Sequence, residues 1–154
     1  MTSSAAFLGA LFAKAAEPTI PLPTNRKLTK AGVALTAEAI LKLHQLADWM
    51  ELAMSNRQPD PTVVLGYTSI CRLPSGVTSV SAFGALVQMF DPFKLSEAKY
   101  YFKEQTAHVH YYDLVPRVAR ILDISIKEVD ALLTYLYTPN FGLSYVILKL
   151  RDIG

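Results

Sequence analysis

Apolar side chains recur at intervals of three and four residues over much of the chain, the spacing of an amphipathic helix. The longest such stretch runs from about residue 36 to residue 56, with an apolar stripe formed by Ile40, Leu43, Leu46, Ala47, Met50 and Met54. Shorter stretches predict helices over residues 79–90 and 96–112. Thr, Val, Tyr and Ile between residues 62 and 72 predict one short extended segment. The spacing over residues 143–151 does not decide between helix and strand, so the pattern predicts five or six helices.

The most ordered signal is the stretch 114–137, which predicts a helix, a tight turn and a second helix. Pro116 fits the first turn of the first helix, where its missing N–H costs nothing. Ser125 followed by Glu128 forms the capping-box pattern that begins a helix. From there, apolar residues recur at helical spacing: Ile126, Val129, Leu132, Leu133 and Leu136.

This pattern resembles the helix-turn-helix of DNA-binding regulators. Ala119 is the small residue between the helices, Ile124 the buried residue of the turn, and Val129 with Leu132 the inward face of the recognition helix. The resemblance implies that residues 116–134 read duplex DNA. The sequence departs from the motif at Asp123, where glycine is usual, and in a mixed exposed face made of Lys127, Glu128, Asp130 and Thr134. An ordinary helical hairpin within a bundle fits the same pattern.

The N-terminal residues 1–30 have the character of an arm. Residues 3–16 predict a short helix with an apolar face formed by Phe7, Leu8, Leu11 and Phe12. Residues 17–23 contain three prolines and predict an extended tether, and Arg26, Lys27 and Lys30 follow as a basic cluster. An apolar segment on a stiff spacer is typical of arms that dock on a neighbouring subunit.

These elements predict an all-α protein. We expect residues 31–154 to form a single helical-bundle-like domain, preceded by the extended N-terminal arm and ending with the helix-turn-helix-like pair. No stretch of the sequence approaches the ~20 apolar residues of a membrane span. No positive charge precedes the apolar N-terminal run, so a virion or cytoplasmic location is favoured over secretion.

Composition adds one argument for assembly. The chain is 51% hydrophobic but only 18% charged, whereas soluble proteins carry about 25% charged residues. This deficit predicts apolar surface that a partner or further copies of the chain cover. The net charge of +2 is too small to indicate a nucleic-acid partner by itself.

No pattern of residues predicts catalysis, a cofactor or a metal. His108 and His110 would diverge on a helix and would align only on a strand. The single cysteine, Cys71, excludes an internal disulfide and has no nucleophile motif around it. Glycine-rich phosphate-binding motifs are absent from the sequence. We therefore expect a protein that is not an enzyme.

Aromatic residues crowd the predicted helix 96–112. Tyrosine is favoured at protein interfaces because it offers an apolar ring with a polar tip. Burial in the core and stacking on single-stranded bases are the alternatives. We expect self-association first, through Tyr100, Tyr101, Tyr111 and Tyr112.

Two functional hypotheses follow. The first is a non-catalytic structural subunit of the coat or scaffold type, which forms a homo-oligomer or filament through its arm and its tyrosine-rich helix. DNA or RNA would then contact basic residues, for which the candidates are Arg26, Lys27, Lys30, Arg117, Arg120 and Lys127. The second is a helix-turn-helix regulator that reads DNA with residues 116–134.

Overall fold

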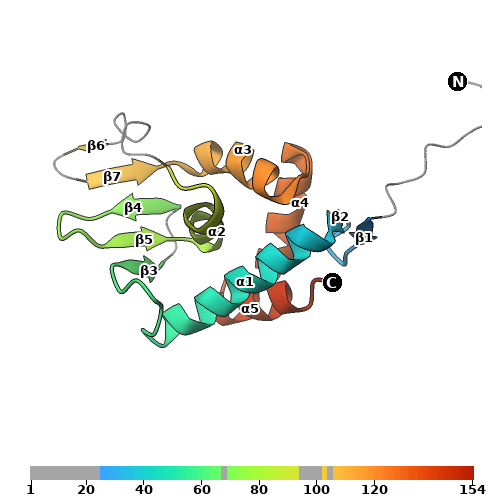
Figure 1. Ribbon diagram of the computed structural model, residues 1–154, viewed down its shortest axis with the longest axis horizontal. Helices are drawn as coiled ribbons and strands as arrows, with labels where there is room; N and C mark the ends of the chain where they lie inside the picture. The colour runs from blue at the N-terminus through green and yellow to red at the C-terminus, as the bar shows by residue number, and fades with distance from the viewer. Residues whose placement is uncertain (1–24, 67–68, 94–101, 104–105) are drawn as a thin grey trace, which may run out of the picture.

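The protein is a mixed α and β structure, so the all-α prediction is wrong. The computed structural model describes residues 25–66, 69–93, 102–103 and 106–154. Figure 1 shows a small sheet at one end of the molecule and a group of helices at the other, with α2 (Ala82–Phe90) next to the sheet. Helix α2 therefore lies between the sheet and the other helices, and it contacts α1 and α3.

The main sheet has the strand order β3-β5-β4-β7-β6. Strands β3 and β5 pair in parallel, and the other pairs are antiparallel. The strands are short: β3 Val63–Leu65, β4 Ile70–Arg72, β5 Thr78–Val80, β6 Phe102–Lys103 and β7 Thr106–Val109. A separate antiparallel pair is formed by β1 (Arg26–Leu28) and β2 (Ala34–Thr36).

Four further helices make up the other end of the molecule: α1 Ala37–Met54, α3 Tyr111–Leu122, α4 Ile126–Tyr137 and α5 Leu143–Arg151. Helix α1 contacts α2, α3 and α5, and it buries one stripe of its surface against them, made of Ala39, Leu43, Leu46, Ala47, Met50 and Ala53. The segment 143–151, which the sequence left open, is a helix. Among the described helices, none combines the length and the apolarity that crossing a bilayer requires.

The predicted helix over residues 96–112 is the main error. Within this stretch the described residues form β6, β7 and the start of α3, and residues 94–101 and 104–105 lie outside the described residues. Strand β7 pairs with β4, which places Val109 opposite Ile70 in a buried row. Strands of two to four residues are too short to show a clear alternation in sequence, so the long-range pairing decided the structure here.

The turn of the predicted helix-turn-helix-like pair has the expected local structure, but α3 begins at Tyr111, so the prediction that Pro116 lies in its first turn is wrong. Asp123 adopts the left-handed conformation, with φ 55°, and its N–H donates to the carbonyls that end α3. The Ser125 hydroxyl accepts from the Glu128 N–H while the Glu128 carboxylate accepts from the Ser125 N–H, so the predicted capping box is confirmed. The turn between α3 and α4 is therefore fixed by hydrogen bonds within the turn itself.

The burial of α5 gives a matched test of the fold. Leu150 is fully buried, whereas Leu148 on the same helix is 65% exposed. We expect Leu150→Ala to lower the free energy of unfolding by about 2–5 kcal/mol, because it leaves a cavity in the core. Leu148→Ala is the control and should change it by no more than about 0.5 kcal/mol. Urea denaturation measures both, and equal losses would contradict the placement of α5.

Candidate functional site

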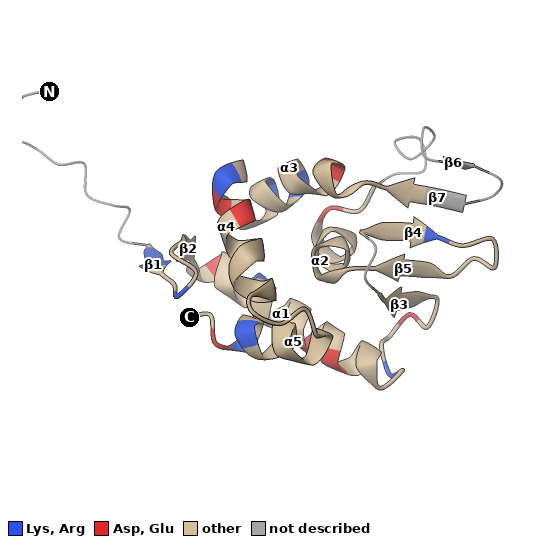
Figure 2. Ribbon diagram, turned by 180° about the vertical axis from the view of Figure 1, so that it is seen from behind, with Lys and Arg blue, Asp and Glu red and all other residues tan. Residues whose placement is uncertain are grey.

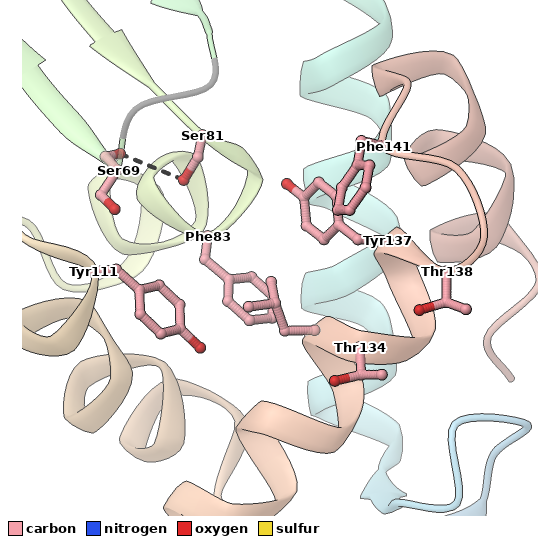
Figure 3. A pocket seen from close by; sticks show the side chains of 9 residues that line it. Ser69, Ser81, Phe83, Tyr111, Thr134, Tyr137, Thr138 and Phe141 are labelled. Atoms are coloured by element: carbon pink, nitrogen blue, oxygen red, sulfur yellow. Dashed lines mark hydrogen bonds between the residues drawn. The ribbon is translucent and has the colours of Figure 1, made fainter.

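The most developed concave surface among the described residues is a groove between α2, the start of α3 and α4. It has a volume of about 520 Å³, within the range of about 300–1,000 Å³ typical of binding sites. We call it the aromatic groove. Its lining consists of aromatic rings, hydroxyl groups and one leucine, with no charged side chain: Ser69, Ser81, Phe83, Tyr111, Leu133, Thr134, Tyr137, Thr138 and Phe141. Figure 3 shows Tyr111 and Tyr137 on opposite sides of it.

The wall of the groove at α2 depends on a close approach of two backbones. The Ser69 carbonyl accepts from the Ser81 N–H at 3.1 Å, and the Ser81 hydroxyl caps α2 by accepting from the Gly84 N–H. A Cβ at residue 84 would lie only 1.8 Å from the Ser69 oxygen, so only glycine fits there. This contact holds both serines beside Phe83, as Figure 3 shows.

The two sides of the groove are tied together by Tyr111. Its hydroxyl donates to Asp130 Oδ1 on α4 at 3.0 Å. Burial, together with this hydrogen bond, raises the pKa of the Tyr111 hydroxyl to about 12. The tyrosine is therefore neutral and a hydrogen-bond donor at physiological pH, and it fixes the start of α3 relative to α4.

Helix α4 divides its surface between the core and the groove. Val129, Leu132 and Leu136 are its fully buried residues. Leu133 and Tyr137, four residues apart, line the groove instead. Tyr137 stands 6.2 Å from Phe141, centroid to centroid, and Phe141 is 72% exposed. This side of α4 therefore presents apolar and aromatic surface that the described chain buries only in part.

The predicted self-association residues divide into two groups. Tyr111 lines the groove, and Tyr112 lies beside it in an edge-to-face contact, with 75% of its surface exposed. The remaining candidates lie outside the described residues: Phe7, Leu8, Leu11, Phe12, Tyr100 and Tyr101. The sequence did not predict the groove residues of α2 and α4. Helix α4 has apolar residues on a second face as well as on its buried face, and this pattern could have revealed Leu133 and Tyr137.

The basic cluster at the end of the arm, Arg26, Lys27 and Lys30, is held by contacts within the same chain. Arg26 forms an ion pair with Asp123 at 2.9 Å, and Lys30 forms one with Asp152 at 2.6 Å. Lys27 donates to the Gly154 carbonyl oxygen at 2.5 Å. These contacts fasten β1 to the α3–α4 turn and to the residues after α5. Figure 2 shows acidic segments near these basic ones.

The other predicted nucleic-acid contacts are also largely engaged. Arg117 is buried and donates to the carbonyl and the carboxylate of Asp91, with its guanidinium 3.8 Å from the centroid of Phe93. Arg120 pairs with the same aspartate at 3.2 Å. Lys127 is exposed and has no partner among the residues that the structure describes. The six candidates therefore do not form one continuous basic surface.

A row of polar side chains crosses the outer face of the sheet, formed by Ser79, Cys71 and His108. Cys71 lies opposite His108 on one side and Ser79 on the other. The sequence analysis placed His108 on a helix and so missed this alignment, while His110 caps α3 and leaves the row. No hydrogen bond joins Cys71 to His108 among the described contacts, and a cysteine nucleophile needs a base within reach. Within the described residues, no three metal-ligating side chains gather.

The raised pKa of Tyr111 predicts how the free energy of unfolding depends on pH. The unfolded tyrosine ionises near pH 10, whereas the folded one ionises near pH 12, so the folded state keeps a proton that the unfolded state loses. This contribution to stability is complete below pH 10 and declines as the pH rises towards 12. We expect urea denaturation at pH 9 and pH 11 to show a larger loss for the natural chain than for Tyr111→Phe. Equal losses would contradict the raised pKa of Tyr111.

The functional interpretation rests on this geometry. Comparisons with protein-family models, with curated proteins and with solved structures find no match to the chain. The site that the described residues offer is an uncharged aromatic groove with exposed aromatic residues at its edge.

Proposed function

We propose that the protein is a non-catalytic structural subunit that assembles with copies of itself, in the manner of a coat or scaffold protein. The observation that carries the proposal is the aromatic groove, which is open, uncharged and bordered by the exposed rings of Tyr112 and Phe141. Surfaces enriched in Tyr and Phe and depleted of charge are typical of the centre of protein interfaces.

Composition supports the same proposal. The chain carries fewer charged residues than a soluble monomer normally does, and large apolar side chains remain exposed outside the groove as well, among them Leu28, Leu41, Ile126 and Leu148. Single exposed apolar residues are ordinary, but the groove has a pair of contacting rings on each side, Tyr111 with Tyr112 and Tyr137 with Phe141. An assembly that covers these rings would remove them from water.

Nucleic acid is a secondary partner in this proposal. A protein held on nucleic acid needs several Lys or Arg side chains directed at phosphates. Arg26, Lys30 and Arg120 already pair with carboxylates of the same chain, so binding a phosphate would require breaking those pairs. These pairs are exposed and therefore weak, but their loss still opposes binding. The assembly is proposed to depend on apolar contacts.

The alternative is a helix-turn-helix regulator that reads duplex DNA with α4. The left-handed Asp123 and the capping box favour this alternative, because they give the turn its required shape. The exposed side of α4 offers Lys127 but also Asp130, which accepts from Tyr111. A single lysine beside a carboxylate is a weak phosphate-binding surface.

Removal of the arm tests the assembly proposal. We expect a chain that lacks residues 1–23 to lose its oligomeric state and to keep its fold, because the described contacts of residues 25–154 form a closed core. Sedimentation velocity measures the association, and circular dichroism with urea denaturation serves as the control for folding. A truncated chain that stays as associated as the full chain would rule out the arm as the means of assembly.

Charge reversal at Lys127 tests the regulator alternative. If α4 reads DNA, Lys127→Glu should weaken duplex binding and reduce its dependence on salt by about one counterion. The matched control is Arg57→Glu, which reverses an exposed cation just after α1, outside the helix pair. Binding measured by fluorescence anisotropy across a salt series decides the question. Unchanged binding in the Lys127 variant would remove α4 from consideration as a recognition helix.

A further inference from the structure

We infer that the apolar segment formed by residues 7–12 of one copy occupies the aromatic groove of a second copy. This inference rests on the proposed self-assembly and names its contact on both sides. The groove is an open surface lined by aromatic residues, and the arm contains an uncharged apolar segment. Three properties connect the two: chemistry, reach and stiffness.

The chemistry of the two surfaces matches. Residues 3–12 carry no charged side chain, and the groove lining carries none either. A charged ligand would therefore find no partner in the groove, whereas the rings of Phe7 and Phe12 can pack against those of Tyr137 and Phe141. Aromatic pairs of this kind gain about 0.5–1.5 kcal/mol beyond the burial of their area. The hydroxyl groups at the groove wall can bond the backbone of a bound segment.

The arm is long enough to reach a groove. The described chain begins beside the α3–α4 turn, where Arg26 binds Asp123. The groove lies at the other end of α4, and a 12-residue helix is about 18 Å long. Residues 13–16, at ~1.5 Å per residue in the predicted helix, and residues 17–24, at ~3.1 Å per residue when extended, together span up to ~31 Å. The reach of the tether therefore exceeds the length of α4, which is enough to bring the apolar segment to a groove.

The stiffness of the arm favours a second copy over the chain's own groove. Proline restricts its own φ angle, so the sequence, with Pro18, Pro21 and Pro23, predicts an extended tether. A predicted tether longer than α4 would overshoot the groove of its own chain unless it folded back. Docking on a neighbour requires no such reversal. Exchange between two copies gives a closed dimer, and exchange along a series gives a filament.

Photo-crosslinking in the full chain tests this contact. Benzoylphenylalanine is introduced at position 12, and ¹⁴N and ¹⁵N copies are mixed before irradiation. We expect crosslinks to the groove, at Tyr137, Phe141 or their neighbours, in peptides that join a light and a heavy chain. The control places the same probe at Leu28, which is exposed but lies on β1 beside the α3–α4 turn.

A pair of exposed apolar residues supplies a second measurement. Phe141→Ala should lower the association constant of the full chain by about tenfold or more, as truncation of an aromatic interface contact does. Leu148→Ala, which removes a comparably exposed side chain from α5, should leave association unchanged. Both positions are exposed, so neither substitution endangers the fold.

Each remaining outcome overturns a specific statement. Crosslinks found only in light–light and heavy–heavy pairs, with no mixed pair, would place the segment in its own chain and overturn the exchange. Crosslinks outside the groove in a chain that still associates would overturn the inference and leave the proposed function standing. A full chain that does not associate at all would overturn the proposed function itself.

Discussion

The turn from Asp123 to Ser125 is the constraint on which the candidate site depends. Because Asp123 takes a left-handed conformation and Ser125 immediately begins the next helix, α3 and α4 cannot continue as one helix. Helices joined by so short a turn cross at a steep angle, so their far ends diverge. The start of α3 and the end of α4 therefore stand apart, and the aromatic groove occupies the space between them with Phe83 of α2 beside it.

Two further contacts convert that divergence into a fixed site. Arg117 is buried against Asp91 and Phe93, which holds α3 to the end of α2. Tyr111 bridges from α3 to Asp130 of α4. A buried arginine is tolerated only when its N–H groups are paired, so the Arg117 contacts are costly to break. The groove thus results from the contacts that hold α2, α3 and α4 together. The hydrogen bonds of Arg117 and Tyr111 supply the polar contacts, so the lining itself needs no charged side chain.

The sequence predicted the elements whose signals are local. The helical spacing of α1 and the Ser125 capping box both depend on residues within a few positions of one another, and the structure confirms them. The sheet depends on long-range pairing, such as Ile70 with Val109, which leaves almost no signal in strands this short. The groove was missed for the same reason, because Phe83, Tyr111 and Tyr137 come together only in the folded chain. The basic residues had a visible charge pattern, but the acidic partners of Arg26 and Lys30 lie about a hundred residues away.

The central claim is that the protein assembles through apolar contacts. The most direct measurement is light scattering on a sizing column, with absorbance at 260 and 280 nm recorded before and after nuclease treatment. The account predicts a particle whose mass is a multiple of 17.0 kDa and does not change with nuclease. A particle of 17.0 kDa at every concentration, free of nucleic acid, would contradict it.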